Sequence, residues 1–322
     1  MFNLVERRRT YYVFSSFLIV LGIAAMVYSL ASTGTLLQVS IDFTGGTLLS
    51  LQFTEKVDEQ EVRDFVEAFG ADEVIVQELQ AIEQTDSDAP AYPDGSRWSV
   101  RTNELSAAEV TQLLDEISAE VAPLDREATS TSQVSASVGD EVTTASFRAI
   151  LAATALILGF IYFAFRKVPH GYRYAICAII AMIHDILIIV SAISVLGLVL
   201  GWEVDALFLT ALLTVVAYSV QDTIVVFDRI RENLPKRREE SYELIVNRSV
   251  LETIHRSFAT QLNAVFVMIA IVLFGGETIR QFVLILLIGL TSGTYSSIFI
   301  AVPLLVSWSK GELPIIRGDV NE

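Results

Sequence analysis

Six separate stretches of apolar residues divide this chain, and each is about 20 residues long. An α-helix rises about 1.5 Å per residue, so about 20 residues cross the hydrocarbon core of a bilayer. The pattern therefore predicts a polytopic α-helical membrane protein with six transmembrane helices. Hydrophobic residues make up 52% of the 322 residues and charged residues only 19%, which favours the same class. The predicted spans are Tyr11–Leu30, Ser146–Phe165, Tyr174–Leu200, Ala206–Phe227, Phe258–Phe274 and Phe282–Val306.

Charge is distributed unevenly along the chain. Residues 31–145 contain 23 Asp and Glu but only 5 Lys and Arg, whereas the whole chain has a net charge of −16. Lys and Arg near the ends of membrane helices mark the cytoplasmic side. Here these residues all fall on one side of a six-span arrangement, so both termini are predicted to be cytoplasmic and residues 31–145 extracytoplasmic. The flanking residues are Arg7, Arg8, Arg9, Arg166, Lys167, Arg173, Arg229, Arg231, Lys236, Arg237, Arg238 and Lys310.

The spans and charges predict four parts. Residues 1–30 are the cytoplasmic N-terminus and transmembrane helix 1, and residues 31–145 an extracytoplasmic domain. Residues 146–306 hold helices 2–6, and residues 307–322 form a cytoplasmic C-terminal tail. The first apolar run is longer than that of a signal peptide and lacks a cleavage site, so it is read as an uncleaved anchor. We find no basic stripe or nucleic-acid motif, and nucleic acid is not an expected partner.

The segment 31–145 shows alternating strand and helix patterns. Gln38–Phe53 is predicted as a strand broken at Gly45-Gly46, and Thr129–Val138 as the last strand. Two further strands are predicted around Val76 and at Trp98–Arg101. Outside this domain, Tyr242–His255 is predicted to be an amphipathic segment on the membrane surface. Helices follow the capping-box pairs Asp58/Glu61 and Ser106/Glu109. The order βαββαβ predicts a ferredoxin-like α+β domain between helices 1 and 2.

Ionisable side chains inside membrane spans are costly and mark functional sites. Asp185 lies near the middle of the third span, after His184, and Asp222 lies in the cytoplasmic third of the fourth. Arg256 stands at the entry to the fifth span, at a depth similar to that of Asp222. Asp222 and Arg256 are therefore predicted to pair across neighbouring helices, either as a proton-coupled switch or as a structural ion pair. Asp185 is predicted to face a partner subunit or a water-filled cleft.

Other features indicate packing rather than chemistry. Gly45-Gly46 lacks the lysine of a phosphate-binding loop and predicts a backbone bend. Cys177 is the only cysteine, so neither an intrachain disulfide nor a thiolate metal site is expected. The charged residues Asp228 and Arg229 follow the fourth span directly, and they predict that this helix ends in solvent. Small residues in the sixth span predict close helix contact, and they are Gly289, Ser292, Gly293, Ser296 and Ser297.

Two motifs resemble one known family. Phe43, Gly45 and Gly46 complete an F-x-G-G pattern after the first span, as in the SecD/SecF family of protein-export membrane proteins. The run Tyr218–Asn233, which includes Gln221, Asp222, Asp228 and Arg229, is similar to the fourth-span motif of the SecF branch. His255-Arg256-Ser257 and Phe274-Gly275-Gly276 also resemble this branch. Two departures are mild: Ala217 stands where Gly is usual, and Gln221 where Asn is usual.

The resemblance implies a function and its partners. It implies a SecF-type subunit of the SecDF complex, in a bacterial inner membrane, that uses the proton gradient to assist export of unfolded polypeptides through the SecYEG channel. A separate SecD chain would supply a complementary carboxylate, and Asp222 and Arg256 would match residues required for proton-coupled work. Membrane lipid surrounds the spans. The resemblance implies no cofactor beyond the gradient, no metal and no enzymatic activity.

Two alternatives remain open at the level of sequence. A proton-coupled small-molecule transporter subunit of the resistance-nodulation-division type shares the six-span unit with a large domain after the first span. An intramembrane aspartyl protease would use Asp185 and Asp222 together, since two carboxylates that share a proton activate water. The residues before Asp222 lack the Gly-x-Gly-Asp pattern that such proteases carry.

Overall fold

The computed structural model describes residues 3–71, 74–79, 92–166, 168–275 and 277–312. Lys167, Gly276 and the 313–322 part of the predicted C-terminal tail lie outside the described residues. The chain forms two compact units. We call Met1–Leu36, Arg148–Val195 and Leu207–Glu322 the helical unit. We call Leu37–Phe147 and Leu196–Ala206 the sheet unit.

Long apolar helices build the helical unit and confirm the six predicted spans. The stretches long and apolar enough to cross a membrane are Val5–Ser32, Ala136–Phe165, Tyr172–Leu200, Ala206–Lys236, Tyr242–Phe274 and Ile279–Ser309. They exceed the predicted spans because the helices continue past the apolar residues at their ends. The helices are η1 (Val5–Arg7), α1 (Arg8–Thr33), α5 (Ala136–Phe165), α6 (Tyr172–Leu200), α7 (Ala206–Lys236), α8 (Tyr242–Phe274), α9 (Glu277–Ser296), η2 (Ser297–Ala301) and α10 (Val302–Ser309).

The prediction of Tyr242–His255 as a separate segment on the membrane surface is wrong. It forms the first part of α8, which runs without a break to Phe274. The Ser241 side chain caps this helix by accepting a hydrogen bond from the backbone N–H of Leu244. Val246 and Val250 of the segment are buried in the core of the helical unit. Their burial, rather than an amphipathic pattern on the membrane surface, determines where this segment lies.

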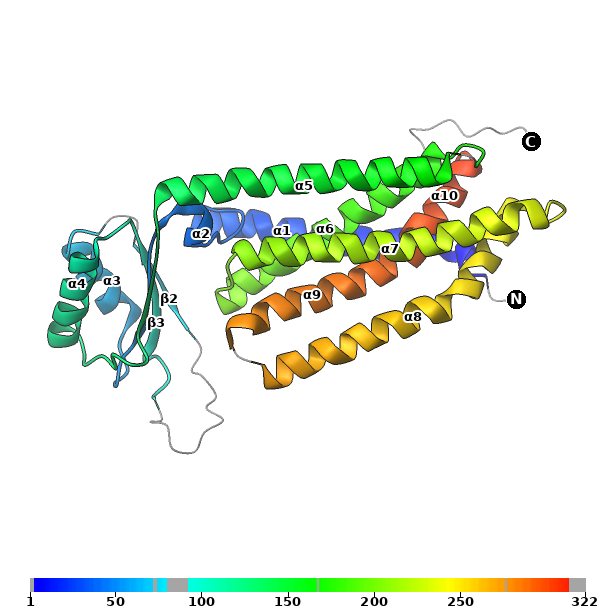
Figure 1. Cartoon of the computed structure of the whole chain (residues 1–322). Coiled ribbons are helices and arrows are strands. Elements are labelled where there is room, and N and C mark those ends of the chain that lie inside the picture. Colours follow the sequence, from blue (N-terminus) through cyan, green and yellow to red (C-terminus); the bar gives the residue numbers. More distant parts are fainter. Residues whose placement is uncertain (1–2, 72–73, 80–91, 167, 276, 313–322) are drawn as a thin grey trace. The chain divides into compact units, whose positions relative to one another are not determined.

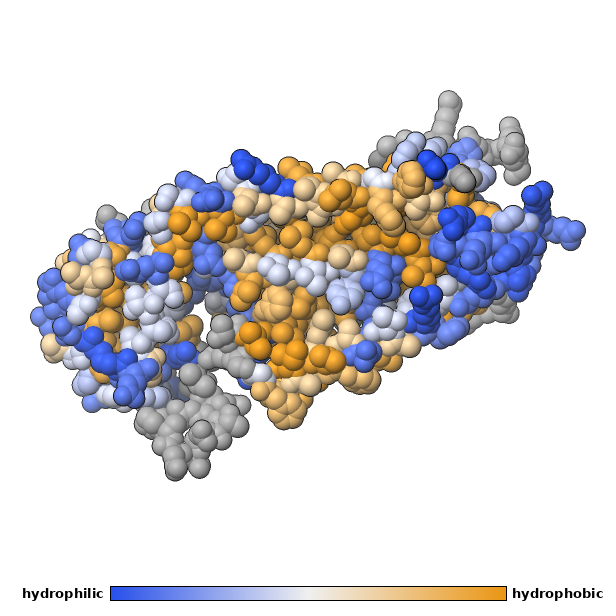
Figure 2. Space-filling view, in the orientation of Figure 1, coloured by the Kyte–Doolittle hydropathy of each residue, from blue (hydrophilic) through white to orange (hydrophobic). Residues whose placement is uncertain are grey.

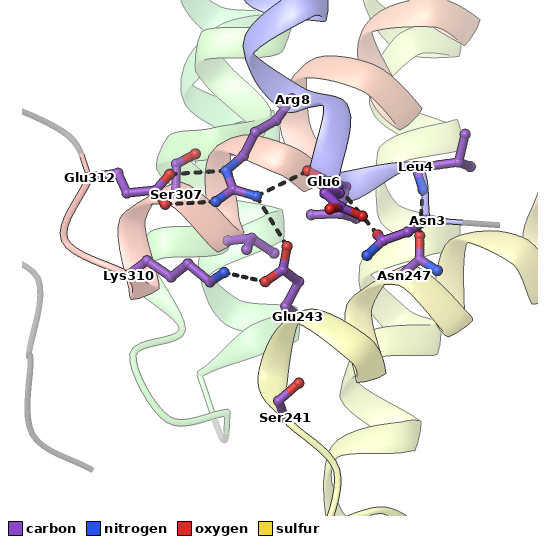
Figure 3. A network of polar contacts seen from close by, with 12 residues as sticks. Asn3, Leu4, Glu6, Arg8, Ser241, Glu243, Asn247, Ser307, Lys310 and Glu312 are labelled. Atoms are coloured by element: carbon purple, nitrogen blue, oxygen red, sulfur yellow. Dashed lines mark hydrogen bonds and ion pairs between the residues drawn. The ribbon is translucent and has the colours of Figure 1, made fainter. Parts of the chain in front are cut away.

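The start of η1 and the end of α10 lie at the same end of the helical unit (Figure 1). We call this the terminal end; there η1 and α8 begin and α10 ends. Arg8 lies between two acidic side chains, and its guanidinium donates hydrogen bonds of 2.9 and 2.6 Å to Glu312 and 3.1 Å to Glu243 (Figure 3). Lys310 forms a further ion pair with Glu243. The first helix, α8 and the segment after α10 are thereby joined.

The four strands of the sheet unit and the two helices that cover them follow one another in the predicted order βαββαβ. The strands are β1 (Gly46–Gln52), β2 (Ile75–Glu78), β3 (Arg97–Thr102) and β4 (Ser130–Val134). The described pairings among these four strands are antiparallel, in the sheet order β2-β3-β1-β4. Helices α3 (Glu59–Ala68) and α4 (Ala107–Glu120) lie on one side of the sheet (Figure 1). Apolar residues of the strands and of both helices form the core between them.

The capping box predicted at Ser106 and Glu109 is present. The Ser106 side chain accepts from the backbone N–H of Glu109, and the Glu109 carboxylate accepts from the backbone N–H of Ser106 at 2.7 Å. Hydrogen bonds from the Ser106 side chain and backbone to the ionised carboxylate hold the pKa of Glu109 below its ordinary value. Asp58 caps α3 by accepting a hydrogen bond of 2.9 Å from the backbone N–H of Gln60.

Two predicted strand boundaries are wrong. Within Gln38–Phe53, residues Ile41–Thr44 form a one-turn helix, α2, capped by Ser40, and the strand begins at Gly46. Within Thr129–Val138, β4 ends at Val134 and α5 begins at Ala136. Both segments are rich in β-branched or aromatic residues, which favour strands locally. The capping by Ser40 and the continuation of α5 outweigh that preference.

The Gly45-Gly46 pair forms the predicted backbone bend. Gly45 has φ 72° and Gly46 has φ 116°, and residues that carry a side chain rarely adopt these backbone angles. Both glycines also lie against backbone. A Cβ atom on Gly45 would lie 2.6 Å from the Cα of Ala136, and one on Gly46 would lie 2.5 Å from the carbonyl oxygen of Thr102. The pair thus lets α2, β3 and the start of α5 approach closely.

Candidate functional site

Asp185 is fully buried inside the helical unit and accepts hydrogen bonds from neighbouring helices. Its Oδ2 accepts from the hydroxyls of Ser219 at 2.5 Å and Ser296 at 2.6 Å. Its Oδ1 accepts from the hydroxyl of Ser292 at 2.7 Å and lies 3.1 Å from Nδ1 of His184. The prediction that Asp185 faces a partner or a water-filled cleft is therefore wrong. It faces hydroxyls of α7 and α9 instead.

Small residues bring these hydroxyls within reach of Asp185. A Cβ atom on Gly289 of α9 would lie 2.3 Å from Cγ2 of Val215, and one on Gly293 would lie 3.0 Å from Cβ of Ser219. Both glycines therefore allow α9 to lie directly against α7, as predicted. Ser292 and Ser296 have a further role that sequence reasoning missed. Their spacing of four residues places both hydroxyls on the face of α9 that meets Asp185.

His184 lies beside the carboxylate and borders a cavity. The cavity has a volume of about 490 Å³, and Phe14, Tyr295 and Thr291 are among its other lining residues. Nε2 of His184 is buried and has no hydrogen-bond partner among the residues that the structure describes. The imidazole therefore lies between Asp185 and this cavity.

Asp222 of α7 is the second buried carboxylate, with an exposed fraction of 5%. Its Oδ2 accepts a hydrogen bond of 2.5 Å from Nε2 of Gln261 on α8. Gln261 was missed at the sequence level, although α8 carries a signal for it. Ser249, Thr253, Ser257 and Gln261 are all polar, all buried and spaced by four residues, which marks an inward-facing polar stripe.

The predicted pairing of Asp222 with Arg256 is not observed. Arg256 is exposed on α8, and its side chain forms no ion pair in the described part of the chain. The reason is helical geometry. Positions five residues apart on a helix differ by about 140° in direction and about 7.5 Å in height. Since Gln261 points at Asp222, Arg256 must point away from it.

The exposed face of α7 is unusually polar for a helix within a span. Thr214, Ala217, Tyr218 and Gln221 line a shallow groove there. Figure 2 shows the corresponding pale stripe crossing the hydrophobic surface of the helical unit. Polar side chains at this depth are costly against lipid and usually meet protein. The buried face of α7 carries Ser219 and Asp222, so one helix contacts both carboxylate sites.

Asp228 and Arg229 form ion pairs near the terminal end of α7. Asp228 lies 2.5 Å from Arg231, and Arg229 lies 2.6 Å from Glu252 of α8 and 2.8 Å from Glu232. All five side chains are partly exposed, which agrees with the predicted solvated helix end. The pair of Arg229 and Glu252 also ties α7 to α8, about two turns along α7 from Asp222 and about two and a half turns along α8 from Gln261.

The F-x-G-G segment meets the segment that joins α6 to α7, and both belong to the sheet unit. The Asp42 carboxylate accepts a hydrogen bond of 3.0 Å from the backbone N–H of Ala206, the first residue of α7. Backbone bonds of 2.9 and 2.7 Å join Ser40 and Gln38 to Val204. Asp42 therefore caps α7 from a position 164 residues earlier. Phe43, the predicted motif residue beside it, is half-buried.

Arg101 of β3 strengthens this connection. Its guanidinium donates a hydrogen bond of 2.6 Å to the carbonyl of Val39 and forms an ion pair with Glu203. Burial lowers the pKa of Arg101 from its ordinary value, but a guanidinium stays charged at neutral pH. The charge is thus retained in a largely enclosed position, where it holds the sheet to the α6–α7 segment.

Comparison with known proteins agrees with these features. The family model for the C-terminal part of the protein export membrane proteins SecD/SecF matches residues 114–311. The protein translocase subunit SecF of Thermobaculum terrenum is 44% identical, over 98% of this chain and 97% of that protein. The SecF subunit of Anaerolinea thermophila is 39% identical, over 97% and 96%.

A solved structure is also similar. The crystal structure of SecDF, a translocon-associated membrane protein from Thermus thermophilus, matches with a TM-score of 0.76 and 29% identity. The match covers 96% of this chain, which spans only 39% of that SecDF chain. With its six membrane-spanning helices, its F-x-G-G segment and its buried carboxylates, the chain belongs to the SecD/SecF family of protein export membrane proteins.

Proposed function

We propose that this chain is the SecF-type subunit of a SecDF complex that uses the proton gradient to assist export of unfolded polypeptides through SecYEG. The observation that carries the proposal is the way Asp185 and Asp222 are held. Both are buried in membrane spans, and their described partners are hydroxyls, an amide and an imidazole rather than Lys or Arg. None of the described contacts pairs either carboxylate with a Lys or Arg side chain.

These partners suit a change of protonation. An ionised carboxylate in a low-dielectric site is costly, and a bound proton removes that cost. A serine hydroxyl both donates and accepts, so it can rotate to receive the proton of a neutral Asp185. The amide of Gln261 has an acceptor oxygen as well as a donor nitrogen. Protonation would therefore reorganise the contacts between α6, α7, α8 and α9 without leaving buried polar groups unpaired.

The exposed residues support SecD as the partner. Arg256 and the polar face of α7 project from the helical unit within or next to the spans. A guanidinium at the edge of hydrocarbon is stabilised by a carboxylate on a neighbouring protein. A second six-helix unit that presents such a carboxylate is what a SecD chain would provide. Arg256 would then act at the interface between the two subunits rather than within this chain.

The capped start of α7 supports transmission to the sheet unit. Asp42 and the pair of Arg101 and Glu203 tie the F-x-G-G segment and β3 to the segment that leads into α7, within the sheet unit. On the same helix, Ser219 donates a hydrogen bond to Asp185, and Asp222 is itself the second carboxylate. A shift of α7 upon protonation would therefore pull on residues 38–42 and on β3. In the proposed topology both termini are cytoplasmic, in a bacterial inner membrane, and the sheet unit is extracytoplasmic.

The experiment is an export assay with reconstituted SecYEG, its motor ATPase, SecD and this chain. Asp222→Asn should abolish the increase in export that an imposed proton gradient produces, because the amide carries no exchangeable charge, while SecD still co-purifies. Asp228→Asn is the matched control on the same helix and should retain most of the increase. Full stimulation in the Asp222→Asn complex would refute the proton-coupling role.

One observation favours the transporter alternative. The cavity beside His184 has a volume of about 490 Å³, within the range of small-molecule sites. If this chain is a small-molecule transporter subunit, purified protein in vesicles should move protons in response to an added amphiphile. Gradient-dependent export should then be the same with and without this chain. The proposed function predicts the opposite result in both measurements. We propose that the chain is not an enzyme and uses no cofactor besides the gradient.

A further inference from the structure

A second cavity lies at the terminal end of the helical unit, away from both carboxylates. Its volume is about 590 Å³. It lies between the turn that joins α5 to α6, the last turns of α7, the start of α8 and the end of α10. Its lining combines arginine side chains with apolar residues of these elements.

The polar part of this cavity is cationic. Among the residues that the structure describes, its lining contains the arginines Arg173, Arg231 and Arg238 and no Asp or Glu. Arg173 is the most enclosed, with an exposed fraction of 7%. Its guanidinium carbon lies 5.8 Å from the ring centre of Trp308 and 5.9 Å from that of Tyr172, which holds the charge in place. Three guanidinium groups around one cavity form a site for an anion that accepts several hydrogen bonds.

The rest of the cavity is apolar. Leu234, Pro235 and Leu305 come from α7 and α10, and Val168 and Pro169 from the preceding turn. A free inorganic anion would gain nothing from these walls and would lose part of its hydration. An amphiphile would satisfy both parts, because its charged head group would meet the arginines and its glycerol and first methylene groups would meet the apolar walls.

The position of the cavity along the helices is the position expected for a lipid head group. The cavity lies where α6 and α8 begin and α7 and α10 end, which is the level of the head groups for helices that cross a bilayer. Basic pockets between transmembrane helices are the places where acidic lipids bind. We propose that this cavity binds the phosphodiester head group of an acidic phospholipid. The proposal does not depend on proton coupling or on SecD.

Bound lipid would act on the last turns of α7. Arg231 lies in the cavity and also pairs with Asp228 at 2.5 Å. Its guanidinium carbon lies 5.9 Å from the ring centre of Phe165 at the end of α5. A phosphate bridging Arg173 and Arg231 therefore links α6 to α7 at the terminal end.

The test is native mass spectrometry of the full-length chain in detergent, with added phosphatidylglycerol as the probe. Phosphatidylethanolamine with the same acyl chains serves as the zwitterionic comparison. We expect phosphatidylglycerol to be retained preferentially. In the double variant Arg231→Gln/Arg238→Gln, its apparent affinity should fall about fivefold per arginine removed. The control Arg237→Gln/Arg248→Gln removes two charges from the same end that do not line the cavity, and it should retain the wild-type affinity.

A second variant tests the apolar part without removing charge. Leu234→Trp fills that part and leaves all three arginines in place, so it should also weaken phosphatidylglycerol binding. Equal retention in the wild type and both cavity variants would overturn the proposal, as would equal losses in the cavity and control double variants. Equal retention of phosphatidylethanolamine would overturn the assignment to an acidic head group. Displacement of the lipid by equimolar inorganic phosphate would show a free-phosphate site and overturn the lipid assignment.

Discussion

Charged side chains are held differently in the spans of the helical unit and in the sheet unit. Asp185 and Asp222 accept hydrogen bonds from Ser and Gln side chains, and the His184 ring lies beside Asp185. Arg101, the most enclosed cation of the described sheet unit, has the opposite charge of Glu203 beside it. An ion pair fixes both partners in their charged forms, whereas neutral donors leave the charge free to change. The difference separates spans whose buried carboxylates have no described Lys or Arg partner from a sheet unit with a permanent ionic connection.

The largest expected effect concerns Asp185, whose removal would leave three hydroxyls and an imidazole in the buried centre. Asp185→Ala should lower the unfolding free energy by about 3 kcal/mol, since several buried polar groups lose a partner at once. Thermal unfolding in detergent measures the change. Asp222→Ala is the matched comparison, and with one donor it should cost about 1 kcal/mol. Equal losses in both variants would contradict the distinction between a many-donor and a single-donor site.

The connection in the sheet unit provides the next test. Arg101→Gln leaves Glu203 without its opposite charge and should cost about 2 kcal/mol, less than a fully buried pair because both side chains retain some exposure. Hydrogen exchange in Leu196–Ala206 should then become faster. Arg63→Gln removes an exposed i,i+4 pair with Glu59 and should change stability by less than about 0.5 kcal/mol. If Arg101→Gln leaves exchange in this segment unaltered, the pair does not hold it.

Gln261 sharpens the comparison within the spans, since it is the described donor to Asp222. Gln261→Leu should cost about 1 kcal/mol of stability and reduce gradient-dependent export several-fold. The control Asn263→Leu changes a nearby polar residue that is exposed on α8 and should affect neither measurement. Normal gradient-dependent export by the Gln261→Leu complex would mean that this donor has no part in the coupling.

The smallest effect is expected at the terminal end. The hydrogen bond from Arg8 holds the pKa of Glu312 below its ordinary value. The stabilisation is therefore complete above about pH 4.3, the ordinary glutamate pKa, and is lost as the pH falls through the lowered pKa. Since Glu312 is partly exposed, we expect about 0.5 kcal/mol.

Limited proteolysis after Ser309 measures this effect at pH 7 and near pH 3. Cleavage should become faster in acid for the wild type. The Arg8→Gln variant should already show the faster rate at pH 7 and should change less with pH. A pH response of the same size in the variant would show that the response comes from other groups.

Local patterns were enough to predict much of the fold. The six spans, the helices after Asp58 and Ser106, the Gly45-Gly46 bend and the order of strands all follow from periodicity, capping residues and backbone preferences within a few neighbouring residues. The wrong boundaries lie at Ile41–Thr44 and Ala136–Val138, where a capping serine and the start of a long helix outweigh strand preference. The candidate residues Asp185, Asp222 and Arg256 could likewise be found from their depth alone.

By itself, the sequence thus determined which segments cross the membrane and which ionisable residues lie within or beside them, because burial of apolar helices and the cost of charge in hydrocarbon act locally. Only the tertiary structure decided their partners. Gln261 is 39 residues from Asp222, Ser296 is 111 residues from Asp185, and Ala206 is 164 residues from Asp42. Such contacts depend on the rotation of each helix about its axis and on close packing at Gly289 and Gly293. Span depth predicts neither of these.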